Sequence, residues 1–254
     1  MENLVKISAS IVVYNEHAAT LQRAIESYLA IKVDKELIII DNSPKNNLQE
    51  ICEKYAGVRY IFTGQNIGFG KGHNLAISHF SKHSTLHMII NPDVYFDGVS
   101  MLQFLRWMES RHDISLAIPK VLNPDGTAQN IVRNIPTPLS LIKRRLHLNY
   151  DEFDMKTEEI NDIPFAHGCF MVFRTDVLKR LGGFDERFFM YMEDVDIFIR
   201  AKEYGKTVIN PAYEIYHEYR KGSSKNLKLL GWHLSSAIKF FMKYKRYKNV
   251  KICS

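Results

Sequence analysis

The first ninety residues contain four short apolar runs, each of which ends in polar side chains. The runs occupy residues 7–14, 36–40, 58–62 and 88–90. Segments with helical spacing lie between them, among them residues 48–55 and 74–81. Strands that face water on one side alternate apolar and polar residues, whereas continuous apolar runs separated by helices are typical of a parallel sheet covered on both faces. We therefore predict an α/β fold with a mostly parallel central sheet flanked by helices.

The second part of the chain continues this pattern less regularly. Residues 98–110 have helical spacing, residues 114–118 form another apolar run, and Asn123-Pro124-Asp125-Gly126 is typical of a tight turn. Periodicity is lost over residues 134–163, which predicts a long, partly helical loop. An apolar segment and an acidic helix start follow, at residues 165–174 and 193–196.

Composition disfavours several classes of protein. With 46% hydrophobic and 24% charged residues over 254 positions, the chain is typical of a globular protein with a full core. Its three cysteines, Cys52, Cys169 and Cys253, are too few and too scattered for a disulfide framework or a four-cysteine zinc site. No apolar run approaches the roughly 18 residues of a membrane span, and the first residues lack the layout of a signal peptide. We expect a cytoplasmic protein.

The net charge of +6 is unevenly distributed along the chain. Residues 220–254 hold ten Lys or Arg and no Asp or Glu, which leaves 24 basic and 28 acidic side chains in residues 1–219. When the body of a chain is acidic and its end is basic, the basic end is typically a single attachment surface for an anionic partner. Nothing in the body favours binding of nucleic acid. We predict a globular domain at residues 1–219 and a basic, amphipathic extension at residues 220–254.

The extension allows two interpretations. From Leu227 to Met242 its apolar residues recur at helical spacing, with lysines beside them. Such a helix can lie in an anionic membrane interface, where lipid headgroups attract the lysines. It can equally pack on the body and leave a solvated basic tip.

Polar residues follow the predicted strands. In open α/β sheets, ligands bind outside the carboxyl ends of the strands, and the residues at those ends are Asn15, Glu16, Asp41, Asn66 and Asp93. Asn66 also begins a glycine-rich segment, residues 66–74, whose backbone could approach a phosphate or a sugar, or could simply form a tight turn. A dinucleotide motif would need glycine in place of His73 and should follow the first strand, which disfavours NAD.

Three further features suggest chemistry. Asp93 follows a strand, where a carboxylate can hold a divalent cation or form a turn. The acidic run from Glu193 to Asp196 follows an aromatic stretch, which would raise the pKa of a carboxylate toward that of a general base, although such residues also cap helices. Asp194 and Asp196 are two residues apart, so one can face a cleft while the other supports the fold. His217 is either a metal ligand or a satisfied histidine.

Six short motifs occur in a fixed order along the chain. They are Ile11-Val12-Val13-Tyr14-Asn15, Ile40-Asp41-Asn42-Ser43, the segment 66–74, Asn91-Pro92-Asp93, Gly168-Cys169-Phe170-Met171, and the segment from Gly183-Phe184-Asp185 to Arg200. In this order the motifs resemble the inverting glycosyltransferases of family 2, which have the GT-A fold. Among these, the chain is similar to bacterial rhamnosyltransferases of O-antigen and related cell-wall glycans.

The resemblance implies roles for individual residues. Asp41 matches the aspartate that hydrogen-bonds the pyrimidine base of the donor, Asp194 matches the catalytic base, and Glu193 would orient the acceptor. The residues implied to bind the donor are Val13, Tyr14, Asn15, Glu16, Asp41, Asn66, Gly68, Asn74, Asn91 and Asp93.

The resemblance also implies a divalent metal, Mn²⁺ or Mg²⁺. Asp93 matches the last aspartate of the family's D-x-D motif, and His217 stands where many relatives place a metal-binding histidine. Asn91 occupies the first position of the motif in place of aspartate, which bears on the strength of metal binding. An imidazole ligand favours Mn²⁺.

The implied reaction is transfer of L-rhamnose from dTDP-β-L-rhamnose, with inversion, to a hydroxyl of a glycan. We expect that glycan to be linked to a polyprenyl diphosphate at the inner face of the plasma membrane. The alternatives are a UDP-sugar donor, such as UDP-galactofuranose or UDP-GlcNAc, and an inactive sugar-nucleotide-binding partner of a glycan assembly complex. The basic cluster at residues 143–145 is either a contact for the lipid diphosphate or a solvated patch.

Overall fold

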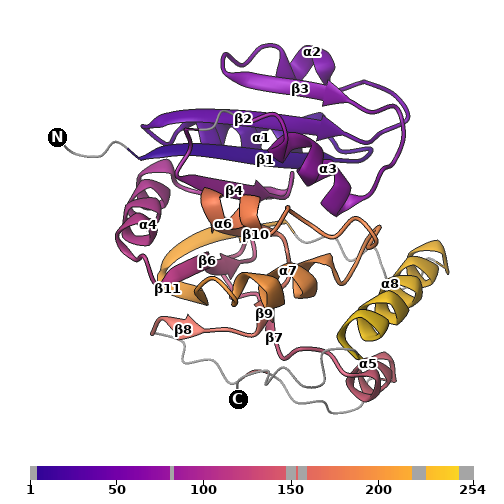
Figure 1. Ribbon diagram of the computed structural model, residues 1–254. Coiled ribbons are helices and arrows are strands. Elements are labelled where there is room, and N and C mark those ends of the chain that lie inside the picture. Colours follow the sequence, from indigo (N-terminus) through magenta and orange to yellow (C-terminus); the bar gives the residue numbers. More distant parts are fainter. Residues whose placement is uncertain (1–4, 81–82, 147–152, 154–158, 219–226, 246–254) are drawn as a thin grey trace.

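The computed structural model describes residues 5–80, 83–146, 153, 159–218 and 227–245 (Figure 1). The four apolar runs form parallel strands in the order β3-β2-β1-β4. Their bounds are β1 (Lys6–Val13), β2 (Asp34–Asp41), β3 (Val58–Phe62) and β4 (Leu86–Ile90). Between them lie α1 (Ala18–Leu29), α2 (Gln49–Cys52) and α3 (Phe69–Ile77). The predicted parallel sheet is confirmed.

The second part of the chain extends the same sheet. Strand β10 (Phe170–Arg174) inserts antiparallel between β4 and β6 (Ile114–Leu122), and β11 (Lys206–His217) pairs parallel with β6. Two short strands, β5 (Val94–Tyr95) and β8 (Asn161–Asp162), pair antiparallel with β11. A separate small sheet joins β7 (Val132–Arg133) to β9 (Phe165–Ala166).

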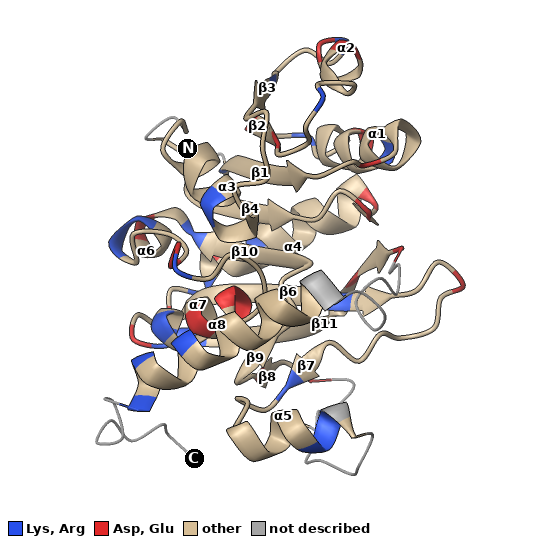
Figure 2. Ribbon diagram, turned by 90° about the vertical axis from the view of Figure 1, so that its right-hand side faces the viewer, with Lys and Arg blue, Asp and Glu red and all other residues tan. Residues whose placement is uncertain are grey.

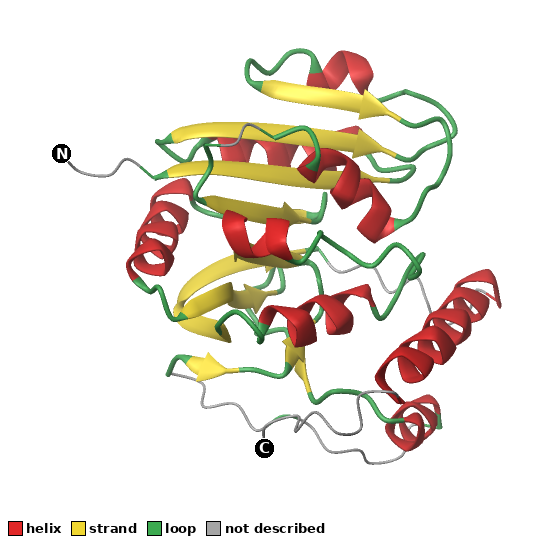
Figure 3. Cartoon of the chain, viewed as in Figure 1, coloured by secondary structure: helices red, strands yellow, loops and turns green. Residues whose placement is uncertain are grey.

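Helices cover both faces of this sheet. Helices α1 and α4 (Gly98–Ser110) lie on one face, whereas α3, α6 (Thr175–Arg180) and α7 (Glu193–Ala201) lie on the other (Figures 1 and 3). The core between these layers is apolar, and Ile11, Ile39 and Phe170 in its strands are fully buried. Helix α5 (Pro138–Arg145) falls within the segment predicted to be a partly helical loop.

The bounds of two helices, α2 and α3, differ from those that the sequence pattern predicts. The helix predicted over residues 48–55 contracts to the four residues of α2, because a tight turn with Gly57 at φ 82° leads directly into β3. Helix α3 begins at Phe69, within the glycine-rich segment. A Cβ at Gly72 would lie 2.8 Å from Val12 of β1, so glycine there permits close packing of α3 on the sheet.

Helix α8 (Leu227–Lys245) packs on the body through one face. The Ser236 hydroxyl donates a hydrogen bond of 2.8 Å to the carbonyl of Met190, and the Lys243 ammonium lies 2.8 Å from the Asp185 carboxylate. The rings of Trp232 and Phe189 are 4.7 Å apart. The division of the chain at residue 219 stays a prediction, since residues 219–226 lie outside the described residues.

None of the helices in the described ranges is both long and apolar enough to cross a membrane.

Candidate active site

The acidic run forms the start of α7, at the wall of a cavity. Just before it, Tyr191 and Met192 have φ values of 71° and 68°, in the left-handed region that residues other than glycine rarely adopt. This strained turn places Glu193 and Asp194 at the first two positions of the helix, where both line the cavity. Oδ1 of Asp194 accepts a hydrogen bond of 2.8 Å from the backbone N–H of Val195.

The environment of this pair favours protonated carboxyl groups. Burial and the neighbouring Asp194 carboxylate raise the pKa of Glu193 to about 8. Burial also raises the pKa of Asp194, against the opposing effect of hydrogen bonds from the backbone N–H groups of Val195 and Gly168. The raised pKa expected of a carboxylate here is confirmed, and it suits Asp194 to accept a proton from a hydroxyl group.

Asp196 lies on the opposite side of α7 and points into the protein. Its fully buried carboxylate accepts hydrogen bonds from Nε of Arg200 at 2.7 Å and from the Tyr244 hydroxyl at 2.8 Å. It also forms an ion pair with the Lys243 ammonium. The spacing of four residues on a helix predicts an ion pair between Asp196 and Arg200, and the structure confirms it. As expected for residues two apart, Asp194 faces the cavity and Asp196 supports the fold.

Asp93 and His217 come together where β5 pairs with β11. Nε2 of His217 lies 3.4 Å from Oδ1 of Asp93, an oxygen that is buried and makes no hydrogen bond. On the other side of the ring, Nδ1 lies 3.0 Å from Oε1 of Gln129. Because that oxygen is an acceptor, it keeps the imidazole proton on Nδ1 and turns the Nε2 lone pair toward Asp93.

This pair of residues fits a divalent cation. A carboxylate oxygen without a hydrogen-bond donor faces an imidazole nitrogen in the form that binds metals. Within the described ranges, no group of three or more His, Cys, Asp and Glu side chains could hold an ion. Further ligands would therefore come from water or a substrate. Asn91, which lines the same cavity, offers an amide in place of a second carboxylate.

The predicted nucleotide-binding residues meet at the carboxyl ends of β1 and β2. Asp41 is fully buried, and its two oxygens accept hydrogen bonds from the Ser43 N–H at 2.8 Å and the Tyr60 hydroxyl at 2.6 Å. The Ser43 hydroxyl accepts a hydrogen bond of 2.8 Å from the N–H of Asn15, whose φ is 50°. This network joins the segment that holds Val13, Tyr14, Asn15 and Glu16 to Asp41. Tyr60 and Ser43 were not predicted as site residues.

The glycine-rich segment holds its shape through close backbone contacts. Gly68 has φ 93°, and a Cβ at this position would lie 2.5 Å from the carbonyl oxygen of Phe189. Asn66 accepts a hydrogen bond of 3.0 Å from the N–H of Gly68. Both amide atoms of the Asn74 side chain bind the backbone of Phe184, at 2.8 Å each. This geometry makes Asn74 an anchor for the loop before α7, and its contact with the donor stays a prediction.

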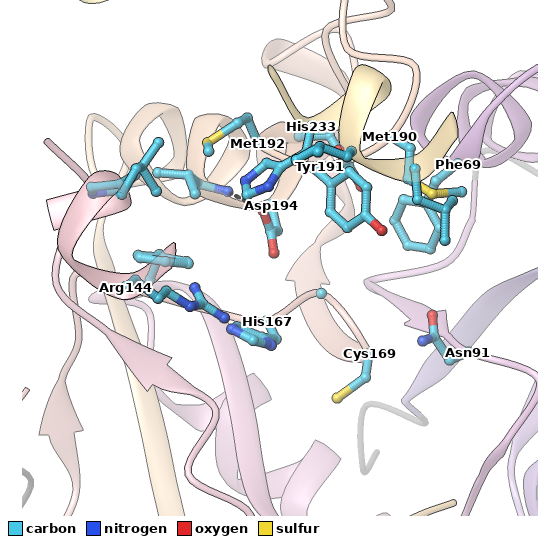
Figure 4. A pocket seen from close by; sticks show the side chains of 18 of the residues that line it. Phe69, Asn91, Arg144, His167, Cys169, Met190, Tyr191, Met192, Asp194 and His233 are labelled. Atoms are coloured by element: carbon cyan, nitrogen blue, oxygen red, sulfur yellow. Dashed lines mark hydrogen bonds between the residues drawn. The ribbon is translucent and has the colours of Figure 1, made fainter. Parts of the chain in front are cut away.

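A cavity of about 850 Å³ joins the carboxyl groups at the start of α7 to the Asp93–His217 pair (Figure 4). The other predicted donor-binding residues do not line it: Val13, Tyr14, Asn15, Glu16, Asp41, Asn66, Gly68 and Asn74. Its lining includes Asn91, Asp93, Glu193, Asp194 and His217, together with side chains from α5 and α8. The polar residues near the cavity that are not among the predicted site residues are Arg144, His167, His233 and, behind His217, Gln129. Gln129 carries no sequence signal, because it is a single polar residue in a segment without a motif. His167 directly precedes the Gly168-Cys169-Phe170-Met171 motif, and His233 belongs to Gly231-Trp232-His233, a segment in which the chain also resembles the rhamnosyltransferases. Arg144 belongs to the basic cluster at residues 143–145.

Comparison with known proteins identifies the family. Residues 8–182 match the family described as Glycosyl transferase family 2. The chain is 24% identical over 250 residues to the rhamnosyltransferase WbbL of Escherichia coli K12, and the match covers 94% of both chains. It is 28% identical over 213 residues to the N-acetylglucosaminyl-diphospho-decaprenol L-rhamnosyltransferase of Mycobacterium tuberculosis, covering 74% of this chain and 68% of the relative.

Solved structures share the fold. GalNAc-T7, solved with UDP, GalNAc and Mn²⁺, is 18% identical with a TM-score of 0.67 over 89% of this chain, and this chain spans only 45% of that protein. The mannosyltransferase PcManGT of Pyrobaculum calidifontis, solved with GDP-Man and Mn²⁺, is 13% identical with a TM-score of 0.62, over 94% of this chain and 64% of that protein. The chain belongs to glycosyl transferase family 2 and is a glycosyltransferase with the GT-A fold.

Proposed function

We propose that this glycosyltransferase transfers L-rhamnose from dTDP-β-L-rhamnose to a hydroxyl of a polyprenyl-diphosphate-linked glycan, in the synthesis of O-antigen or another cell-surface polysaccharide. Two relatives named as rhamnosyltransferases support the sugar, and the name of the mycobacterial relative supports the class of acceptor. The observation that carries the proposal is the cavity that Asp194 shares with the Asp93–His217 pair.

In the proposed transfer step each group has a role. Asp194 takes the proton of the acceptor hydroxyl while the hydroxyl oxygen attacks C1 of the donor sugar from the side opposite the diphosphate, so the configuration inverts. Glu193, beside it in the cavity wall, orients the acceptor. Asp93 and His217 are the residues that would hold Mn²⁺ or Mg²⁺, which when bound stabilises negative charge on the leaving diphosphate. Asn15 and Asp41 lie where the nucleotide would bind.

A UDP-sugar donor is the main alternative, because donor pockets of one fold distinguish sugars by few contacts. The same carboxylates would then act on another sugar. An inactive binding partner is disfavoured by family membership and by the presence of Asp93, Asp194 and His217 in one cavity.

Thermal unfolding with a panel of nucleotide sugars tests the donor. With Mn²⁺ or Mg²⁺, dTDP-rhamnose at 100 times its Kd should stabilise the fold by about 2.7 kcal/mol and raise Tm by roughly 5–10 °C. The Asp93→Asn variant should lose the metal-dependent part of this rise. Selective stabilisation by a UDP-sugar would show that this sugar, and not dTDP-rhamnose, is the donor. No response to any nucleotide sugar would contradict the proposal.

We also propose that α8 attaches the protein peripherally to the inner face of the plasma membrane. The face of α8 that points away from the body exposes a row of apolar side chains four residues apart, Leu234, Ile238 and Met242. Helix α5 exposes a second row, Leu139, Ile142 and Leu146. Both helices lie at the front of the molecule in Figure 2, with lysine and arginine along them. Apolar rows beside basic side chains are typical of helices at anionic lipid surfaces.

Co-sedimentation with vesicles tests this attachment. At low salt the protein should sediment with phosphatidylglycerol vesicles and much less with phosphatidylcholine vesicles. Ile238→Asp removes one large apolar contact and should weaken binding roughly tenfold. Val99→Asp is the matched control, because Val99 is equally exposed but lies on α4. Failure to bind anionic vesicles, or equal weakening by both variants, would contradict the attachment through α8.

A further inference from the structure

The cavity has a basic end that the transfer step does not use. Figure 4 shows Arg144, which reaches in from α5, beside His167. Asn91 lies at the other end of the same view, and Asp194 lies between Arg144 and Asn91, level with His167. Because Asn91 and Asp93 mark the side where the donor diphosphate would bind, Arg144 is on the acceptor side of the proposed base, with His167 beside it.

The positive charge at this end is not neutralised by the described part of the protein. Arg144 forms no ion pair with a described carboxylate, although its charge acts on Asp194 and opposes the rise in the pKa of that group. Burial and the charges of Arg133 and Arg144 lower the pKa of His167 to about 4. His167 is therefore a neutral imidazole with one N–H to donate, beside a guanidinium that is always charged.

This combination suits a phosphate group. A guanidinium presents two parallel N–H donors to phosphate oxygens, and an imidazole N–H can add a third. The carboxyl groups of Glu193 and Asp194 also line the cavity, and burial raises the pKa of both. Consider an acceptor sugar that carries a diphosphate on C1. If one of its hydroxyl groups lies at Asp194, its phosphates lie about the width of one sugar ring from Asp194.

We infer that Arg144 and His167 form the subsite for the diphosphate of the acceptor, an inference that rests on the proposed function. The sugar that receives the transferred residue is then the one attached directly to the diphosphate, and not a sugar farther along a glycan. The reaction that supplies this acceptor must be of the class that transfers a sugar 1-phosphate to a prenyl phosphate. Leu141 and Arg144 of α5, and Leu230 of α8, line the cavity, so the two helices with exposed apolar rows also border the subsite.

Binding of geranyl diphosphate tests the subsite without any assumption about the donor. Calorimetric titration of the full chain is done in EDTA, so that metal at Asp93 and His217 does not contribute. The wild-type protein should bind, Arg144→Gln should weaken binding at least about tenfold, and His167→Gln should weaken it several-fold. Lys143→Gln is the matched control, since Lys143 is an exposed neighbour on α5 that does not line the cavity. Absence of binding to the wild type, or equal effects of the Arg144 and Lys143 variants, would overturn the inference.

Kinetics with two matched acceptors separates this inference from the proposed function. One acceptor is a short prenyl diphosphate sugar, and the other carries the same sugar and chain without the diphosphate. Arg144→Gln should raise KM at least about tenfold for the first acceptor alone, with KM for the donor unchanged. If no donor supports transfer while geranyl diphosphate binding still depends on Arg144, the proposed function fails and the subsite stands. Equal KM values for wild type and variant with the diphosphate acceptor would overturn the subsite alone.

Discussion

Replacement of Asp194 by Asn should reduce turnover at least about 10³-fold while donor affinity stays within about twofold of the wild type. The amide keeps the size of the carboxylate and can still accept a hydrogen bond from the Val195 N–H, so the start of α7 should keep its geometry. It cannot accept the proton of the acceptor hydroxyl, and the oxygen nucleophile is then not generated. The measurement is steady-state kinetics alongside donor binding by thermal shift.

The neighbouring carboxyl group provides the control for this experiment. Glu193→Gln should retain measurable turnover, because Glu193 is assigned to the acceptor and not to proton transfer. The Asp194 carboxylate helps raise the pKa of Glu193 to about 8, so Glu193 is still protonated and neutral when Asp194 ionises. The active form carries a deprotonated Asp194, and because Gln is also neutral, the acidic limb of the rate profile should stay close to its wild-type position. If Glu193→Gln were inactive and Asp194→Asn active, the two roles would have to be exchanged.

Replacement of Asp196 by Ala should lower the free energy of unfolding by about 3–5 kcal/mol, the second large effect that we expect. Asp196 is fully buried and binds Arg200, Lys243 and Tyr244 at once. Its loss leaves Arg200 and Lys243 without their shared anion, and it removes the group of α7 that Lys243 and Tyr244 of α8 both bind. Urea unfolding followed by circular dichroism measures the effect.

Two comparisons make this result specific. The double variant Asp196→Ala with Lys243→Met should be more stable than the sum of the two single effects predicts, because it also removes one of the two cations that shared the lost carboxylate. Lys245→Ala should change stability by less than about 0.5 kcal/mol, since Lys245 is exposed on the same helix. An Asp196→Ala protein as stable as the wild type would show that this buried cluster does not hold α8 to the body.

Local sequence patterns determined the fold class and the edge of the sheet where the site lies. Continuous apolar runs between helices require a sheet covered on both faces, and parallel strands place Asn15, Asp41 and Asp93 at one edge. The separation of Asp194 from Asp196 also follows from local geometry, because residues two apart on a helix point to different sides. These features depend on near neighbours along the chain, which is why the sequence alone predicts them.

Only the tertiary structure decided which distant residues meet. The antiparallel insertion of β10 between β4 and β6 carries Cys169 to the backbone of Asn91, and the pairing of β5 with β11 brings His217 to Asp93. Docking of α8 adds His233 to the cavity, and α5 adds Arg144. The reason is physical: strand order and helix docking depend on the complementarity of whole buried faces, which is a property of the assembled core and not of any single segment.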